Sequence, residues 1–156
     1  MTLFRSLYHQ GFARIAACTL PVTLADPLKN AERTLGVLRD CDRQGVAAVV
    51  FPELGLTGYT LDDLRFQDVV LDGTLEALRR VVAGSRDLLS VAVVGVPLVR
   101  DGLLYNCAAV VHRGRVLGVV PKSHLPRYRE FYEPRHFTSG LRTTGSIRLF
   151  GEDVPF

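Results

Sequence analysis

The chain has 156 residues, of which 47% are hydrophobic, and it carries a formal net charge of +3. That length suffices for one domain with a hydrophobic core and is short for two, so we expect residues 1–156 to belong to a single domain. Acidic and basic residues are interspersed along the chain, which argues against a nucleic-acid-binding arm and for a solvated surface.

A short strand and a helix are predicted first. Residues 12–18 (FARIAAC) form an apolar run typical of a strand buried in a sheet. Asp26 and Pro27 have the residue types of a helix N-cap and first helical position, and Gly45 supplies a stop. Between them an apolar stripe recurs at steps of three and four and should face the sheet: Leu28, Ala31, Leu35, Leu38 and Cys41.

A second strand and helix follow. Residues 46–51 (VAAVVF) form a continuous apolar run, which is typical of a strand covered on both faces. The next amphipathic pattern predicts a helix with Leu75, Leu78, Val81 and Val82 on its buried side.

The pattern then changes to hairpins. The turn dipeptides Asp101-Gly102 and Arg113-Gly114 separate three extended segments, 91–100, 103–112 and 115–120, which predicts an antiparallel meander. Alternating strands and helices followed by hairpins predict an α/β fold, with a mixed sheet flanked by helices on at least one face. The other face of that sheet would need a further layer.

The end of the chain predicts one more hairpin. Residues 146–150 read as a strand, 151–153 as a turn and 154–156 as the start of a partner strand. A strand that begins and then stops would leave unpaired backbone groups. We therefore expect the sequence to be part of a longer chain.

Two charged residues directly follow predicted strands. Glu53 comes after the apolar run at 46–51, at a sheet edge where open α/β sheets bind ligands, and suits a general base. Lys122 follows the strand at 115–120 and suits the stabilisation of an oxyanion. The alternative for each is structural: a carboxylate that caps a turn or pairs with an arginine, and a solvated lysine.

The segment 122–137 combines basic and aromatic residues. This mixture is also found where proteins bind phosphate or single-stranded nucleic acid, but no binding motif accompanies it here. An ordered loop, with Arg129 or Arg135 paired to Glu130 or Glu133, explains the same residues. We therefore expect no nucleic-acid partner.

The cysteines predict neither a disulfide scaffold nor a zinc site. Cys18, Cys41 and Cys107 are odd in number, widely spaced and without a CxxC motif. Burial is the expected state of all three, and only Cys18, at a strand end, is a weak candidate nucleophile. The N-terminus lacks the apolar core of a signal peptide, and no stretch approaches the roughly 18 apolar residues of a membrane span. We expect a cytoplasmic protein with no membrane contact.

Two segments together resemble a known family. FPELGLTGY, which contains Glu53, is similar to the glutamate motif of the nitrilase or carbon-nitrogen hydrolase superfamily, and GVVPKSHLPRYREFYEPRHF, which contains Lys122, is similar to its lysine motif. With YNCAAVVHRGRVLGVV and LYHQGFARIAACT, the chain resembles the glutaminase domains of bacterial, particularly actinobacterial, glutamine-dependent NAD synthetases. The resemblance covers nearly the whole chain and implies an αββα sandwich that residues 1–156 only partly contain.

The resemblance also implies roles for five residues. Glu53 would be the general base and Lys122 would stabilise the tetrahedral intermediate. Tyr128 would contact L-glutamine, Glu133 would support the lysine and the substrate, and Tyr59 would line the pocket. The family's nucleophilic cysteine lies in a motif that residues 1–156 do not contain, so the resemblance implies that this chain is inactive alone.

Further implications concern partners and cofactors. The resemblance implies no cofactor or metal in the glutaminase domain, and ATP and magnesium in a C-terminal synthetase domain that receives the ammonia. It also implies a homo-oligomer. Two alternatives stay open: a stand-alone amidase of the same superfamily, and a non-catalytic remnant that binds a partner.

Overall fold

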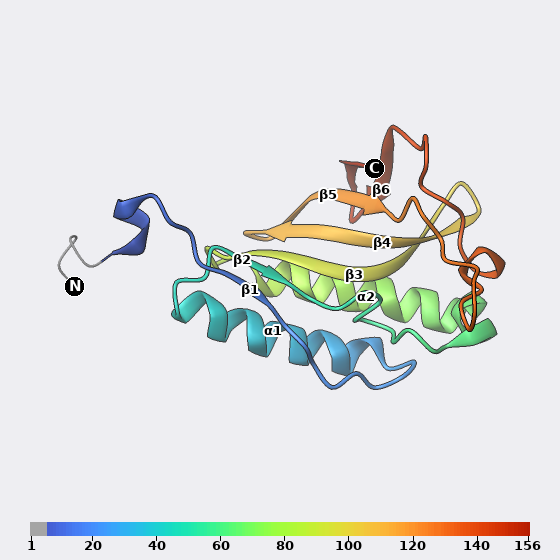
Figure 1. The fold of residues 1–156 in the computed structure, drawn as a ribbon, viewed down its shortest axis with the longest axis horizontal. Helices are drawn as coiled ribbons and strands as arrows, with labels where there is room; N and C mark the ends of the chain where they lie inside the picture. The colour runs from blue at the N-terminus through green and yellow to red at the C-terminus, as the bar shows by residue number, and fades with distance from the viewer. Residues whose placement is uncertain (1–5) are drawn as a thin grey trace.

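A computed structural model describes residues 6–156. Within that range, strands β1–β5 form one mixed sheet in sequential order, and both long helices lie on the same face of it (Figure 1). A separate two-stranded sheet, β6–β7, contacts β5. The elements are η2 (Leu7–Gln10), β1 (Ile15–Ala17), α1 (Pro27–Arg43), β2 (Ala48–Val50), η3 (Asp62–Phe66), α2 (Asp68–Gly84), β3 (Val91–Arg100), β4 (Leu103–His112), β5 (Arg115–Pro121), η4 (Glu133–Arg135), β6 (Ser146–Leu149) and β7 (Glu152–Pro155).

Helix α1 begins and ends where its capping residues predict. The Asp26 carboxylate accepts a hydrogen bond from the Lys29 N–H at 3.2 Å, and Pro27 occupies the first turn. Gly45 follows the helix in the left-handed conformation, with φ +69°. The predicted stripe is confirmed at Ala31, Leu35, Leu38 and Cys41, which are buried, whereas Leu28 is half-buried.

Strands β1, β2 and β3 are parallel, and α1 and α2 connect them. This confirms the predicted alternation of strands and helices. In α2 the predicted Leu78, Val81 and Val82 are buried, but Leu75 is 39% exposed. The buried stripe of α2 continues through Ala77, Thr74 and Val70 instead, because residues spaced by three and four lie on one helix face.

Strands β3, β4 and β5 form the predicted antiparallel meander. Both connecting dipeptides adopt positive φ at each residue, with values of 52° and 75° at Asp101-Gly102 and 46° and 79° at Arg113-Gly114. Such tight turns match the twist of paired strands. The structure therefore places the end of β5, and Lys122 after it, beside the middle of β4.

Three expectations about burial and pairing are wrong. Strand β1 is at the edge of the sheet and Ile15 is 75% exposed, because only β2 pairs with it. Strand β2 is covered on one face only, since Val50 is 47% exposed within the described residues. The last hairpin is paired along its whole length, from Ser146–Pro155 to Leu149–Glu152, and turns at Phe150-Gly151 rather than at 151–153.

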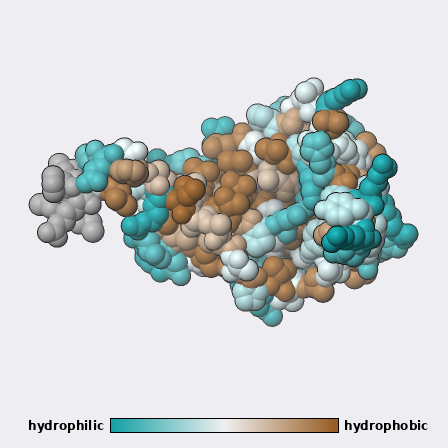
Figure 2. Space-filling model, viewed as in Figure 1, coloured by the Kyte–Doolittle hydropathy of each residue, from teal (hydrophilic) through white to brown (hydrophobic). Residues whose placement is uncertain are grey.

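The face of the sheet opposite the helices is open and partly apolar. Val50 and Val120 lie there, 47% and 61% exposed, and Figure 2 shows hydrophobic residues gathered across the middle of the molecule beside the projecting N-terminal arm. In residues 6–156, no helix has the length and apolar character needed to cross a membrane.

Candidate active site

Glu53 lies in a tight turn that leaves the end of β2. The next residue, Leu54, is fully buried and adopts a left-handed φ of +50°, which turns the backbone sharply after the carboxylate. The turn packs directly on Gly95 of β3. A Cβ at that position would lie 2.3 Å from the Pro52 carbonyl oxygen and 2.5 Å from the Leu54 nitrogen. Glycine at position 95 is therefore needed for the turn to approach the sheet and present Glu53.

Lys122 is held in place by its own backbone. Its N–H donates to the Asn106 carbonyl oxygen of β4 at 2.7 Å, which extends the β4–β5 pairing by one residue. Its carbonyl oxygen accepts the Gly140 N–H at 2.9 Å. The backbone of Lys122 is thus fixed between β4 and the segment around Gly140, and its side chain projects from this fixed point.

The structure brings Glu53, Lys122, Glu133 and Tyr59 into one polar chain. The Lys122 ammonium donates to Glu53 Oε1 at 2.7 Å and to Glu133 Oε1 at 2.9 Å. The Tyr59 hydroxyl donates to the same Glu133 oxygen at 2.5 Å. The Glu53 side chain is 44% exposed, Lys122 29% and Glu133 only 5%. Glu53 and Lys122, which the sequence placed after two separate strands, are therefore direct partners.

The electrostatic interactions among these four side chains favour a charged Lys122 and a neutral Tyr59. Burial lowers the pKa of Lys122, but hydrogen bonds to Glu53 and Glu133 outweigh it and raise the pKa above the ordinary value. Burial and the hydrogen bond to Glu133 raise the pKa of Tyr59. At neutral pH the site therefore holds an ammonium and a phenol that donate to carboxylates.

Two hollows lie on either side of the lysine. One, of about 290 Å³, is lined by Glu53, Lys122 and Asn106 on the open face of the sheet. The other, here called the aromatic hollow, has a volume of about 370 Å³ and is lined by Tyr59 and Glu133, by the rings of Phe131, Tyr132, His136 and Phe137, and by four polar or charged residues. The second oxygen of Glu133, Oε2, is buried and has no hydrogen-bond partner within the described chain. A buried, unpaired carboxylate oxygen suits a ligand that brings a donor, such as an ammonium group.

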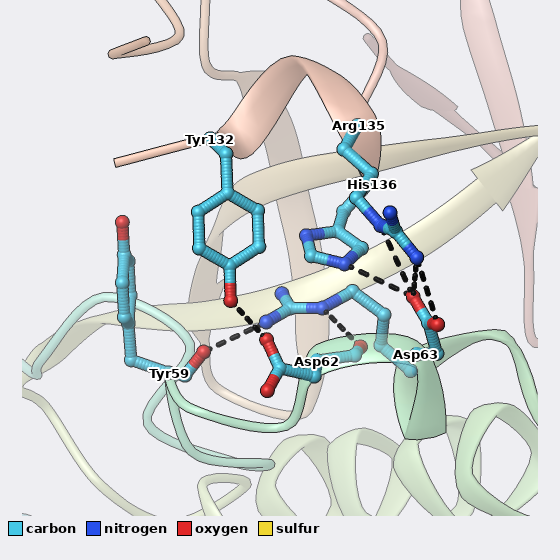
Figure 3. A network of polar contacts seen from close by, with 7 residues as sticks. Tyr59, Asp62, Asp63, Tyr132, Arg135 and His136 are labelled. Atoms are coloured by element: carbon cyan, nitrogen blue, oxygen red, sulfur yellow. Dashed lines mark hydrogen bonds and ion pairs between the residues drawn. The ribbon is translucent and has the colours of Figure 1, made fainter. Parts of the chain in front are cut away.

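Two loops that lie far apart in sequence contact each other beside the second hollow. Asp62 and Asp63, at the start of η3, reach across to the segment around η4 (Figure 3). The Tyr132 hydroxyl donates to Asp62, and Arg135 forms an ion pair with Asp63 at 2.9 Å. His136 Nε2 lies 3.4 Å from Asp63. The predicted pairing of Arg135 with Glu130 or Glu133 is wrong, because the partner carboxylate comes from the other loop.

Arg65 fastens the first of these loops from inside. It is 5% exposed, donates to the backbone oxygens of Tyr59 and Asp62 at 2.7 and 2.9 Å, and stacks over the Phe137 ring at 4.8 Å. Burial lowers the pKa of Arg65. These contacts tie the backbone that carries Tyr59 to the segment that carries Glu133.

Tyr128 is the predicted site residue that lies outside the polar chain. It is 63% exposed, and its ring contacts Phe131 edge-on with centroids 5.6 Å apart. Phe131 lines the aromatic hollow. Tyr128 is therefore one ring away from that hollow, and its contact with a substrate stays a prediction.

The surroundings of the cysteines do not favour a nucleophilic thiol. Burial raises the pKa of Cys107 to about 12, and its strand neighbours are Val96 and Pro121. Burial and the neighbouring Cys41 raise the pKa of Cys18. A nucleophilic thiol needs the opposite shift. Among residues 6–156, no cluster of three or more His, Cys, Asp or Glu side chains could hold a metal ion.

Sequence reasoning missed Asn106, Arg65 and the aspartates of η3. The signal for Asn106 was its position: an amide in the middle of the apolar strand LLYNCAAVV must find a hydrogen-bond partner when buried. Asp63 and Arg135 carried no local signal, because 72 residues separate them.

Comparisons with known proteins identify the family of this chain. Residues 14–153 match the carbon-nitrogen hydrolase family. The chain is 51% identical over 153 residues to the glutamine-dependent NAD(+) synthetase of Mycobacterium tuberculosis and 45% identical to that of Mycobacterium leprae. Each match covers 98% of this chain but only 22% of the mycobacterial protein.

A solved structure gives the same result for the fold. The crystal structure of a glutamine-dependent NAD(+) synthetase from Cytophaga hutchinsonii superposes with a TM-score of 0.85 at 28% identity. The superposition covers 92% of this chain and 25% of that one, and confirms the predicted nitrilase-type α/β fold. Since the family match spans most of its residues, this chain belongs to the carbon-nitrogen hydrolase family.

Proposed function

We propose that residues 1–156 supply the glutamate and lysine of a glutaminase site that hydrolyses L-glutamine to L-glutamate and ammonia. The observation that carries the proposal is the Lys122 ammonium, held 2.7 Å from Glu53 and 2.9 Å from Glu133. The names of the mycobacterial relatives, which share about half of this chain's residues, support glutamine as the amide.

In this proposal Glu53 acts as the general base and Lys122 as the electrostatic group. A cysteine thiol from outside residues 1–156 gives its proton to Glu53 and attacks the carboxamide carbon. The Lys122 ammonium stabilises the negative oxygen of the tetrahedral intermediate. The amide nitrogen takes the proton from Glu53 and leaves as ammonia. Water then hydrolyses the thioester to glutamate.

The aromatic hollow would hold the amino-acid end of glutamine. Its lining includes the buried Glu133, which has one unpaired oxygen, and Tyr59. An α-ammonium group placed there would satisfy that oxygen. Tyr128 would contact the substrate from the exposed side of Phe131.

Within the intact protein, we propose that the ammonia amidates nicotinic acid adenine dinucleotide in a synthetase domain. That domain would use ATP and magnesium, and the assembly would be a homo-oligomer. The intact enzyme would then be a glutamine-dependent NAD synthetase.

A chimera tests the proposal. Residues 1–156 would be joined to the remaining sequence of the Mycobacterium tuberculosis relative, and ammonia release from L-glutamine would be measured. We expect activity in the chimera and none in residues 1–156 alone. Glu53→Gln and Lys122→Ala should each lower kcat by roughly 10²–10⁴-fold, the usual contribution of such groups.

The matched control is Glu76→Gln. Glu76 lies on α2, where it pairs with Arg79 and Arg80, and it should leave kcat unchanged. Glutaminase activity in the isolated 156 residues would contradict the proposal. So would a chimera whose activity survives both substitutions at the site.

A further inference from the structure

We propose that Asn106 is a positioning residue for Glu53. Its side-chain amide occupies one oxygen of the Glu53 carboxylate, so that the other oxygen is left to take the proton. This inference rests on the proposed function, in which Glu53 is the general base. It adds to the site a residue of β4, whereas Glu53 and Lys122 come after the ends of β2 and β5.

The position of Asn106 is fixed by both its backbone and its side chain. The residue is 3% exposed and pairs with Pro97 of β3. Its carbonyl oxygen accepts the Lys122 N–H at 2.7 Å. Its side-chain amide donates to Glu53 Oε1 at 2.5 Å. One buried residue therefore contacts both charged groups of the proposed site.

The two donors to Glu53 meet at a single oxygen. Oε1 accepts from Asn106 Nδ2 and from the Lys122 ammonium, at 2.5 and 2.7 Å. Within residues 6–156 the other oxygen, Oε2, accepts no hydrogen bond. A carboxylate held by Lys122 alone could rotate and exchange its oxygens. With the amide in place, the carboxylate plane is set by two donors from different directions, and Oε2 becomes the proton acceptor.

The proton balance assigns the two oxygens different tasks. The proton leaves the incoming nucleophile, forms a bond to Glu53 Oε2, and passes from there to the leaving nitrogen, with no oxidation or reduction. Oε1 stays hydrogen-bonded throughout, so the carboxyl group does not reorient between the two transfers. Such preorganisation accelerates the chemical step rather than substrate binding.

Nuclear magnetic resonance of the 156-residue chain tests the contact without any enzyme activity. The side-chain amide protons of Asn106 should change chemical shift in Glu53→Gln, because this substitution replaces the carboxylate that accepts their hydrogen bond. Asn30 is the matched control: it is 2% exposed, and within residues 6–156 its amide nitrogen donates to the backbone oxygens of Thr23 and Leu56 and to no carboxylate. An Asn106 side-chain signal that is unchanged in Glu53→Gln would overturn the proposal.

Kinetics of the chimera test the consequence for catalysis. Asn106→Ala removes the donor and leaves a cavity, whereas Asn106→Leu removes the donor but keeps a branched side chain with the same number of heavy atoms. We expect both to lower kcat about 10–100-fold with KM changed less than about threefold, because orientation is lost and binding is not. Asn30→Ala, which loses buried hydrogen bonds elsewhere, should lower stability and leave kcat per folded molecule unchanged.

The outcomes separate this inference from the proposed function. If the kcat of Asn106→Leu equals that of the unsubstituted chimera while Asn106→Ala is slower, Asn106 only fills space and the inference is wrong. If Glu53→Gln leaves the chimera active, the proposed function fails, and Asn106 cannot be a positioning residue for its base. If Glu53→Gln abolishes activity while the Asn106 variants match Asn30→Ala, the function stands and the inference alone fails.

Discussion

At the scale of single residues, the site is defined by a lysine between two unequal carboxylates. Glu53 is nearly half exposed, whereas Glu133 is buried. A buried carboxylate is tolerated only when it is paired and hydrogen-bonded. Lys122 and Tyr59 both donate to it, so the ammonium that serves the proposed reaction also pays the desolvation cost of Glu133. Stability and function are therefore coupled through Lys122.

This coupling predicts a change in stability at alkaline pH. The folded-state pKa of Lys122 and of Tyr59 lies above the ordinary values of 10.5 and 10.0. A raised pKa contributes stability that is present below the unfolded value and is lost as the pH rises through the folded value. Glu133→Gln removes the charge that helps to raise both pKa values, so the variant should lose less of its remaining stability above pH 10.5.

Urea unfolding at neutral and alkaline pH, together with carbon NMR of the Lys122 side chain, measures this effect. The titration of Lys122 should move to lower pH in Glu133→Gln. Glu76→Gln removes an exposed carboxylate of α2 and should leave the alkaline dependence unchanged. Equal alkaline losses in the unsubstituted chain and in Glu133→Gln would show that Glu133 does not sustain the raised pKa values.

The residues of the site differ in how far the sequence alone reveals them. Glu53 and Lys122 follow strongly apolar runs, so their place at strand ends could be derived from pattern. Glu133 and Tyr59 became candidates only through resemblance to a family. Their mutual hydrogen bond joins positions 74 residues apart, and no local pattern encodes it. The sequence indicates that Asn106 needs a hydrogen-bond partner, because it is an amide in an apolar strand. The sequence does not indicate that this partner is Glu53.

At the scale of elements, the order of strands and helices follows from periodicity, turn dipeptides and capping residues. The sequence-based predictions that are wrong concern how far neighbouring elements cover each strand. An apolar run such as 12–18 reads as buried, yet β1 lies at the sheet edge with Ile15 exposed. Burial of a strand depends on its neighbours in space, and a run of apolar letters does not specify them.

The contact between β3 and the turn after β2 predicts the effect of a single methyl group. In Gly95→Ala the new Cβ would overlap backbone atoms of Pro52 and Leu54, so the turn must shift and carry Glu53 with it. We expect a loss of about 1–3 kcal/mol in the free energy of unfolding, as for other overpacked sites. Urea denaturation measures the loss, and the Asn106 amide resonance reports the displacement of Glu53.

Gly36→Ala is the matched control for that substitution. Gly36 lies within α1, and a Cβ there meets no atom within 4 Å. Alanine should therefore stabilise the helix by about 0.5–1 kcal/mol, because it restricts the unfolded chain. A Gly95→Ala protein as stable as the unsubstituted chain would mean that the turn can move away from β3 without cost.

At the scale of the whole molecule, helices cover one face of the sheet only, and much of the opposite face is open. Both helices pack on the same side (Figure 1), and the opposite face carries the hollow lined by Glu53 and Lys122. Apolar side chains on that face contact solvent, and β1 presents an edge strand. Exposed apolar patches and unpaired edges both favour association between chains.

The open face therefore predicts self-association of the 156-residue chain. Sedimentation velocity at rising protein concentration should show species larger than the 17.2 kDa monomer. Val50→Lys with Val120→Lys places two charges on the open face, where burying them in an interface is costly, and should shift the chain towards monomer. Val69→Lys is the matched control, because Val69 is 78% exposed at the start of α2, on the other side of the molecule's sheet. A chain that stays monomeric at every concentration, or an equal response to Val69→Lys, would show that the open face is not the surface through which chains associate.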